Sequence, residues 1–317
     1  MTKKNNQNPK LIDTDKVYDS VFWAEANVLS RYLPMLVNEA FGEHFTTNAK
    51  VDLLPNKQIT ETTDGKKIRR DVDMLFTLTE NLDSTVYKLY HYEIETKGRS
   101  SIAIRIAQYA TAHAFTSILA IDDGAEIEIP YSCVIFLRTD STDISKLTVY
   151  INYPGGRVSY NIPVLKIKDY TLDYIFEKML LLLIPFYVFN IPDKDFEEME
   201  KDATKISEIE VILTDINYRL QKLVDAGELN SHEKGNILHY TIDVLTKLLE
   251  KHPKTQKGVN HMSIAIIRTE FDEMQDIIDM QKAQLAEQET ALAQKDNTIA
   301  QKDAEIIRLT KLLSEKA

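Results

Sequence analysis

The sequence predicts an α/β fold built on a mixed β-sheet. Residues 16–42 and 100–120 carry apolar side chains at spacings of three and four, which is typical of amphipathic helices. Residues 71–78 and 86–95 alternate apolar and polar side chains, as strands with one covered face do. Residues 131–137 are a continuous apolar run, which favours a buried strand parallel to a neighbour. Helices and strands that follow one another in this order predict a mixed sheet covered by helices.

The first helix, over residues 16–42, contains Pro34, which should kink it or split it in two. Glu25 and Glu39 also lie in this segment. A carboxylate on a first helix can reach a metal site in the sheet, but a solvated helix face explains both residues more simply.

Residues 49–60 alternate weakly and predict one strand, and Asp64-Gly65 is a strong turn signal. A local basic cluster follows, formed by Lys66, Lys67, Arg69 and Arg70. These residues either contact phosphate or belong to a solvated edge strand. It directly precedes the acidic start of the next strand.

The helix over residues 100–120 should bury one apolar stripe, formed by Ile102, Ile106, Tyr109, Ala110, His113 and Ile118. Asp122-Asp-Gly124 is expected to end this helix. Residues 147–153 and 157–164 flank Pro154-Gly-Gly156, which predicts a further hairpin.

From about residue 170 the pattern becomes helical, with helices expected over 171–183, 194–226 and 231–251. Asn230 and Glu233 have the spacing of a capping box at the start of the last one. Residues 252–258 are expected to form a loop at a boundary. The predicted organisation is therefore a disordered N-terminus, a core, a helical region and a long C-terminal helix, over residues 1–15, 16–190, 191–258 and 259–317.

The C-terminal segment carries an apolar residue every seven positions, at Ile278, Leu285, Leu292, Ile299, Ile306 and Leu313. The positions three residues further on are polar except at Leu309, so the second row of a coiled-coil seam is thin. The pattern predicts a long helix that self-associates weakly through residues 270–317, and a single solvated helix fits it nearly as well.

Composition narrows the function classes. A net charge of −11 and a pI of about 5.2 argue against a protein that binds nucleic acid through overall basic charge. Local basic groups or a bound metal ion can still offset this charge near a phosphate. Cys133, the single cysteine, lies in an apolar run and is expected to be a buried thiol.

No secretory signal is visible in the polar N-terminus, so a cytoplasmic location is expected. The most apolar segment, residues 179–191, is too short to span a bilayer and contains Pro185. It predicts a core element, and no membrane association is expected.

The candidate chemistry lies between residues 67 and 109. If residues 71–78 and 86–95 pair as a hairpin, Asp71 or Asp73 approaches Glu93, Glu95 and Lys97, which share one strand face. Carboxylate oxygens suit Mg²⁺, and a bound Mg²⁺ activates water for attack on phosphate. His91 is assigned to the opposite face from the carboxylates. No P-loop, dinucleotide glycine pattern or cysteine–histidine metal spacing competes with this site.

Four motifs in order resemble the Rpn family of recombination-promoting nucleases, also described as PD-(D/E)XK nuclease family transposases. They are Asp19-Ser-Val-Phe22, Arg70-Asp-Val-Asp73, Glu93-Ile-Glu95 and Arg105-Ile-Ala-Gln-Tyr109. The resemblance covers roughly residues 16–190. It implies a restriction-endonuclease-like core that hydrolyses DNA phosphodiester bonds with Mg²⁺ or Mn²⁺, in recombination, mobile-element or defence biology.

The resemblance also assigns roles. Asp73 and Glu93 are expected to hold the metal, with Glu95 in the place where the family has Gln or Lys. The residue types alone favour Glu95-Thr-Lys97 as the Glu-x-Lys motif, so the register stays open. Lys97 can supply the cation that Glu95 lacks. The residues expected to contact DNA or brace the carboxylates are Arg70, Arg105, Gln108 and Tyr109.

Because Glu95 stands where the family has Gln or Lys, two functions remain open. One is an active endonuclease, in which Asp73, Glu93 and Glu95 together bind the metal. The other is a catalytically inactive nuclease fold that binds or scaffolds partners and forms homo-oligomers through its C-terminal helix.

Overall fold

The chain divides into two compact units, Met1–Ser263 and Ile264–Ala317. The computed structural model describes residues 15–55, 57–61, 67–79, 87–97, 101–116, 118–138 and 144–262, with Lys282 and Lys302. Side chains are described in these ranges except at residues 15–16, 57–61, 67–71, 97 and 116. The N-terminus predicted to be disordered over residues 1–15 therefore lies outside the described residues except for Asp15, which begins α1. The helix predicted over residues 259–317 lies outside them except for residues 259–262, which are helical, and those two lysines.

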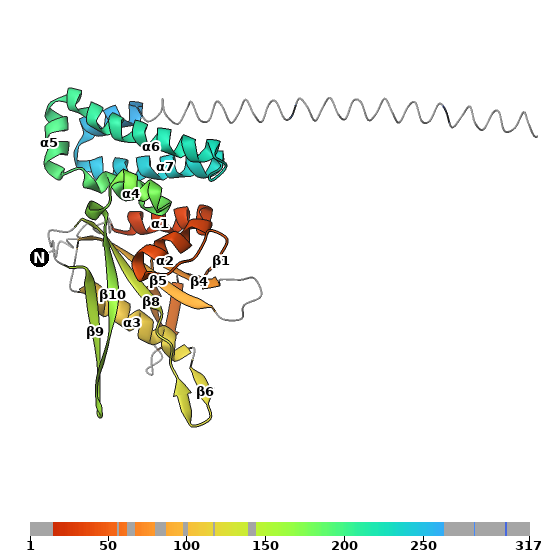
Figure 1. Ribbon diagram of the computed structural model, residues 1–317. Helices are drawn as coiled ribbons and strands as arrows, with labels where there is room; N and C mark the ends of the chain where they lie inside the picture. Colours follow the sequence, from red (N-terminus) through yellow and green to blue (C-terminus); the bar gives the residue numbers. More distant parts are fainter. Residues whose placement is uncertain are drawn as a thin grey trace, which may run out of the picture. The chain divides into compact units, whose positions relative to one another are not determined.

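The core of the first unit is a six-stranded mixed sheet (Figure 1). Its strands, in spatial order, are β1 (Lys50–Leu53), β4 (Met74–Thr79), β5 (Lys88–Lys97), β8 (Tyr131–Arg138), β10 (Gly156–Lys166) and β9 (Lys146–Tyr153). β5, β8 and β10 run parallel to one another, and the remaining neighbours are antiparallel. The predicted α/β class with a mixed sheet is confirmed, and so is the pairing of β4 with β5.

Two small hairpins differ from the prediction. Residues 49–60 hold two strands, β1 and β2 (Lys57–Glu61), and β2 pairs with β3 (Lys67–Asp71). Asp122-Asp-Gly124 does not end a helix; it makes the turn between β6 (Leu119–Ile121) and β7 (Gly124–Glu126). All six residues of β6 and β7 are exposed, so no buried side of the strands leaves an alternating signal in the sequence.

Helices cover both faces of the sheet. α1 (Asp15–Val28), the 3₁₀ turn η1 (Ser30–Tyr32) and α2 (Leu33–Phe41) pack on one face, where the Tyr92 hydroxyl donates to the Leu36 carbonyl at 3.0 Å. Pro34 lies in the first turn of α2, so the predicted split of the first helix is confirmed. α3 (Ser101–Thr116) covers the other face.

The predicted stripe of α3 is largely confirmed, because Ile102, Ile106, Tyr109 and Ala110 are buried. Ile118 is an exception. It follows the end of the helix and is exposed, because the chain turns there into the β6–β7 hairpin.

The C-terminal half of the first unit is helical. It comprises η2 (Ile167–Asp169), α4 (Leu172–Glu177), η3 (Leu181–Leu183), η4 (Pro185–Asn190), α5 (Asp193–Lys201), η5 (Ala203–Ile206), α6 (Ser207–Asp225), α7 (Ser231–Leu248) and η6 (Leu249–Lys251). The helix predicted over 194–226 is thus interrupted by η5. Residues 253–262 are helical, so the loop predicted over 252–258 is wrong beyond its first residue.

The helix predicted over 171–183 begins as expected, with Thr171 capping Tyr174, but α4 ends at Glu177. Met179 then adopts a left-handed conformation with φ 53°. Its N–H donates to Phe176, and the Leu180 N–H donates to Ile175. These two bonds form a Schellman motif, which ends the helix in the way that a glycine usually does.

The apolar segment 179–191 is a core element, as predicted: Leu180–Phe186, Val188, Phe189 and Ile191 are buried. Cys133 is also buried, in the central strand β8. Among the described helices, none combines the length and apolar character needed to cross a lipid bilayer.

α7 packs against α1 and closes the core on that side. The predicted capping box at Asn230 and Glu233 is present, and Arg31 Nη2 adds an ion pair to Glu233 at 2.7 Å. Glu25 of α1 is fully buried, which overturns the solvated-face interpretation for this residue. Neither of its carboxyl oxygens has a hydrogen-bond partner among the described residues, and burial raises its pKa well above the ordinary value.

Candidate active site: carboxylates beneath helix α3

The β4–β5 hairpin places Asp73 against Glu93. Met74 pairs with Tyr92 across the two antiparallel strands, so the preceding Asp73 lies opposite Glu93. Asp73 Oδ2 accepts a hydrogen bond from the Ile94 N–H at 2.7 Å, which fixes the carboxylate against β5. Asp71, the alternative that the sequence left open, belongs to β3 and its side chain lies outside the described set.

Alternation along β5 turns Glu93 and Glu95 toward α3, and both carboxylates are buried. Arg105, in the second turn of α3, spans the two: its Nη2 lies 2.6 Å from Glu93 Oε2 and 2.7 Å from Glu95 Oε1. The guanidinium itself is half exposed, so it separates these carboxylates from solvent.

The assignment of His91 to the opposite face is wrong. His91 precedes Glu93 by two residues, and residues two apart on a strand share a face. Its Nε2 lies 2.9 Å from Glu93 Oε1, and its Nδ1 lies 3.3 Å from Ser132 Oγ on the neighbouring strand β8. The Tyr109 ring packs on the imidazole at 4.5 Å between centroids. His91 is thus a site residue that correct counting of the strand period identifies.

The pKa values of the two central carboxyl groups move in opposite directions. Burial, followed by the charges of Glu93 and Asp19, raises the pKa of Asp73 well above its ordinary value. Burial also acts to raise the pKa of Glu93, but the hydrogen bond and charge of His91 and the charge of Arg105 outweigh it and lower that pKa. Asp73 is therefore the more readily protonated of the two groups.

Asp19 is a second residue that the prediction did not place in the site. It lies on α1, and its charge acts on Asp73. In the sequence it was noted only as the first residue of the Asp-x-x-Phe motif, because no local pattern indicates which strand end a helix side chain will approach.

The remaining predicted residues have different surroundings. Gln108 is exposed on α3 one turn after Arg105, whereas Tyr109 is buried, and burial and then Glu93 raise its pKa, which keeps the phenol neutral. Lys97 is the last residue of β5, and Arg70 belongs to β3. Their backbones pair with Arg138 and Gln58 respectively, but their side chains are not among those described.

The chemistry of the donor set suits a hard divalent cation, since it consists of carboxylate oxygens. Arg105 contacts Glu93 and Glu95, and the pKa of Asp73 beside them is raised first by burial and then by the charges of Glu93 and Asp19. Within the described part of the chain, no three histidine, cysteine or acidic residues are already arranged as a metal centre. Arg105 lies between two of the candidate ligands, Glu93 and Glu95.

No family model, curated protein or solved structure matches this chain. The function proposed for the site therefore depends on its geometry and on the motif resemblance described above.

Proposed function

We propose that the chain is a DNA endonuclease that depends on Mg²⁺ or Mn²⁺ and has a restriction-endonuclease-like, PD-(D/E)XK-type core. The observation that carries this proposal is the placement of Asp73 beside Glu93, with Glu95 on the same face. An acidic residue beside one strand and two acidic residues on its partner provide hard oxygen ligands at one point of the sheet. The ordered motifs of the Rpn family support the same proposal.

Asp73, Glu93 and Glu95 would hold the metal ion. When bound, the ion lowers the pKa of a coordinated water and neutralises charge on the phosphate in the transition state. Burial raises the pKa of Asp73 most, and the charges of Glu93 and Asp19, which raise it further, favour binding of a divalent cation.

The chain's own residues supply positioning. His91, held by Ser132 Oγ, fixes Glu93 Oε1 and leaves Glu93 Oε2 toward Arg105. Arg105 braces Glu93 and Glu95, and its exposed half can contact a DNA phosphate. Lys97 offers a further cation for the scissile phosphate, and Gln108, on the exposed side of α3, a polar contact to the DNA backbone.

Plasmid nicking tests the activity. With Mg²⁺ or Mn²⁺, the parent chain should convert supercoiled DNA to the nicked form, and Asp73→Ala should abolish the conversion. Asp122→Ala is the control, since it removes an exposed carboxylate from the β6–β7 turn. Equal activity in the parent and in Asp73→Ala, or no activity in either, overturns the proposal.

A separate test decides whether Glu93-Ile-Glu95 or Glu95-Thr-Lys97 is the catalytic motif. With Glu93 as the acid and Glu95 in the Gln/Lys place, Glu95→Lys should raise activity and Lys97→Ala should change little. If Glu95-Thr-Lys97 is the motif, Lys97→Ala should abolish activity and Glu95→Lys should not rescue it. The pairing of Met74 with Tyr92 sets Asp73 opposite Glu93, which favours the first register.

A second function, a catalytically inactive scaffold, is favoured by one observation: Arg105 already pairs with both glutamates. It predicts no metal-dependent cleavage, and homo-oligomers that are lost when residues 270–317 are removed. Calorimetric titration with Mn²⁺ separates the two functions, because binding that Glu93→Gln abolishes is expected only for a working site.

A further inference from the structure

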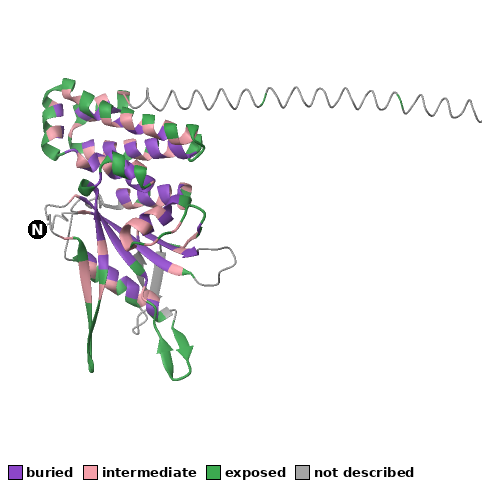
Figure 2. Cartoon of the chain, in the orientation of Figure 1, coloured by how far each residue is buried: buried purple, intermediate pink, exposed green. Residues whose placement is uncertain are grey.

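The β9–β10 hairpin is unusual in charge and in exposure. Residues 144–168, which contain it, include four basic and no acidic residues, although acidic residues outnumber basic ones by 49 to 38 in the whole chain. Residues 150–159, at its outer end, are all exposed (Figure 2). The hairpin therefore projects as a two-stranded ribbon with solvent on both sides.

Such a ribbon gains little stability from its own packing, because an isolated pair of strands is marginally stable in water. Its inner end is held by the core. Leu147, Val149 and Tyr160 pack against the buried cluster that includes Ile102 and Ile106 of α3. The outer end has no such support among the described residues, so its sequence is not explained by the core.

The two faces of the ribbon differ in chemistry. Cross-strand partners share a face, and the register pairs Tyr150 with Ser159 and Asn152 with Arg157. One face therefore presents only hydrogen-bonding side chains on both strands outside Pro163: Lys146, Thr148, Tyr150, Asn152, Arg157, Ser159 and Asn161. The guanidinium of Arg157 lies over the Tyr150 ring at 3.6 Å, which orients it on this face.

This set of side chains suits one class of partner. Arginine and lysine together with Ser, Thr, Asn and Tyr are the groups that contact the sugar–phosphate backbone of DNA. A two-stranded ribbon also fits the width of the major groove. Because the whole chain is negative, an approach to DNA is least opposed where carboxylates are missing.

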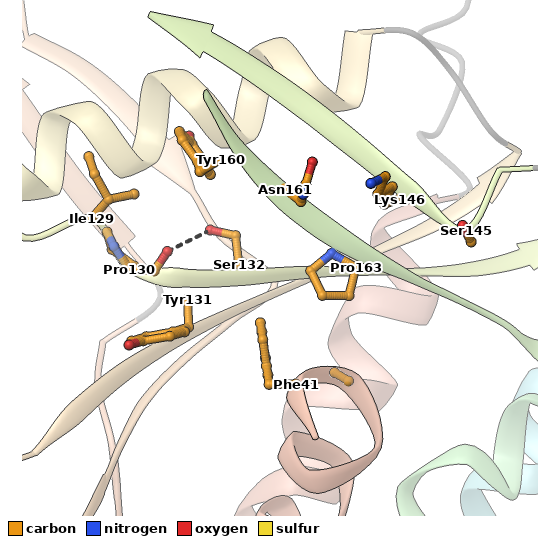
Figure 3. Close-up of a pocket in the computed structure, with 11 residues that line it drawn as sticks. Phe41, Ile129, Pro130, Tyr131, Ser132, Ser145, Lys146, Tyr160, Asn161 and Pro163 are labelled. Atoms are coloured by element: carbon orange, nitrogen blue, oxygen red, sulfur yellow. Dashed lines mark hydrogen bonds between the residues drawn. The ribbon is translucent and has the colours of Figure 1, made fainter. Parts of the chain in front are cut away.

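The acid-free surface continues beyond the ribbon. At its inner end Lys146 and Asn161 border a cavity of about 570 Å³ that Phe41 and Tyr131 also line (Figure 3). No lining residue of this cavity is acidic. Lys146 has no ion-pair partner among the described side chains, so its charge is available to a phosphate.

We propose that the β9–β10 ribbon binds duplex DNA, with the face that carries Lys146 and Arg157 against the sugar–phosphate backbone. The choice of DNA as partner rests on the proposed function. The ribbon itself is separate from the carboxylates beneath α3, so binding and cleavage can be tested apart.

The test measures binding of the full chain to a fluorescently labelled 20-base-pair duplex by anisotropy, in EDTA, from 50 to 200 mM salt. The double variant Lys146→Ala/Arg157→Ala removes two phosphate contacts. It should lower the slope of log affinity against log salt concentration by about 1.8 in magnitude. The affinity at 200 mM salt should fall by about tenfold or more.

The control variant is Lys178→Ala/Lys222→Ala, in which each lysine also lies over a surface tyrosine ring, away from the ribbon. It should bind as the parent does. Thermal melting of both variants should match the parent, since the substituted side chains are exposed.

An unchanged affinity and salt slope in the ribbon variant overturns the proposal, as does a parent chain that does not bind the duplex. A ribbon variant that changes self-association in sedimentation and leaves DNA binding intact overturns it too, and makes the ribbon a contact between copies. Plasmid nicking tests the proposed nuclease activity separately. If the parent cleaves DNA and the ribbon variant binds DNA as the parent does, only the proposed role of the ribbon is refuted. If DNA binding depends on the ribbon but the parent does not cleave DNA, only the proposed nuclease activity is refuted.

Discussion

Replacing Arg105 by alanine should destabilise the chain more than the loss of a surface ion pair does. Arg105 contacts Glu93 and Glu95, whose side chains are 2% and 6% exposed, while its own side chain is 50% exposed. Breaking a buried pair costs about 3–5 kcal/mol, and an exposed pair contributes about 0–1 kcal/mol. Because solvent partly screens the guanidinium, we expect a loss of about 2 kcal/mol, or roughly 4 °C in Tm.

Arg219→Ala is the matched control. Arg219 also bridges two carboxylates, at 2.6 Å from Asp173 and 2.9 Å from Asp215, but those side chains are 82% and 36% exposed. Its loss should cost less than about 1 kcal/mol. Urea unfolding in EDTA measures both variants, and a double-mutant cycle with Glu95→Gln isolates the coupling. An Arg105→Ala loss no larger than that of Arg219→Ala would refute this account of the site.

The sign of the pH dependence follows from Glu93. Its folded-state pKa is lowered, because the effects of His91 and Arg105 outweigh burial, so its contribution to stability is present above its ordinary pKa. This contribution disappears as the pH falls through the lowered value. The deficit of Arg105→Ala should therefore be complete at pH 7 and should shrink below about pH 4. A deficit that does not change between pH 7 and pH 3 contradicts the electrostatic explanation.

Under the proposed function, a divalent ion would neutralise the same carboxylates as Arg105 does. Under the proposed function, Mn²⁺ should raise the Tm of Arg105→Ala more than that of the parent, since binding to the folded state stabilises it by mass action. Glu93→Gln in the same background should remove most of the shift. Equal shifts in the parent and in Arg105→Ala would show that the ion does not bind where the guanidinium lies.

Three further substitutions test the packing around the site by urea unfolding. Glu25→Met should stabilise the fold by about 1–3 kcal/mol at pH 7, because both carboxyl oxygens are buried and neither has a hydrogen-bond partner within the described ranges. Burial raises the pKa of Glu25, so the parent loses stability as the pH rises above the ordinary pKa of a glutamate. The stabilisation by Glu25→Met should therefore be smallest near about pH 4. A stabilisation that increases as the pH falls would contradict this explanation. Met179→Gly should add up to about 1 kcal/mol at the left-handed position, and a loss would mean that the side chain packs better than the strain costs. Asn230→Ala should cost about 1 kcal/mol by removing the cap of α7, and no change would mean that the Arg31–Glu233 pair holds the helix start alone.

Periodicity predicted the parts of the fold that bury one face. The α3 stripe was found because one side of the helix is covered, which imposes a spacing on the apolar residues. β4 is buried at five of its six residues, so the β4–β5 hairpin was found from two apolar runs and the polar turn between them. The segment 179–191 is buried nearly throughout, so it carries no helical period, and the structure divides it into 3₁₀ turns around Pro185. The β6–β7 hairpin was not predicted, for the opposite reason: all residues of its two strands are exposed, so no apolar spacing marks them.

The site was predicted where its residues are neighbours along a strand. Glu93 and Glu95 follow from alternation, and their approach to Asp73 follows from the hairpin register. The contributions of Asp19 and of Arg105 depend on how helices pack across the sheet, and a strand pattern does not contain that information. Asp19 and Arg105 belong to two of the motifs that resemble the Rpn family, but their contacts with the carboxylates are known only from the fold.

These contacts change the meaning of Glu95. By residue type, a glutamate in the place of Gln or Lys adds a third negative charge and suggests an inactive site. In the fold, Arg105 Nη2 lies within 2.7 Å of both Glu93 and Glu95, so the added charge has a cation that a Gln or Lys there would not need. Arg105 therefore offsets, from α3, part of the negative charge that Glu95 adds beside Glu93. A glutamate where the resembled family has Gln or Lys is then not by itself evidence against catalysis, and the response of Arg105→Ala to Mn²⁺ tests whether a divalent ion binds where the guanidinium lies.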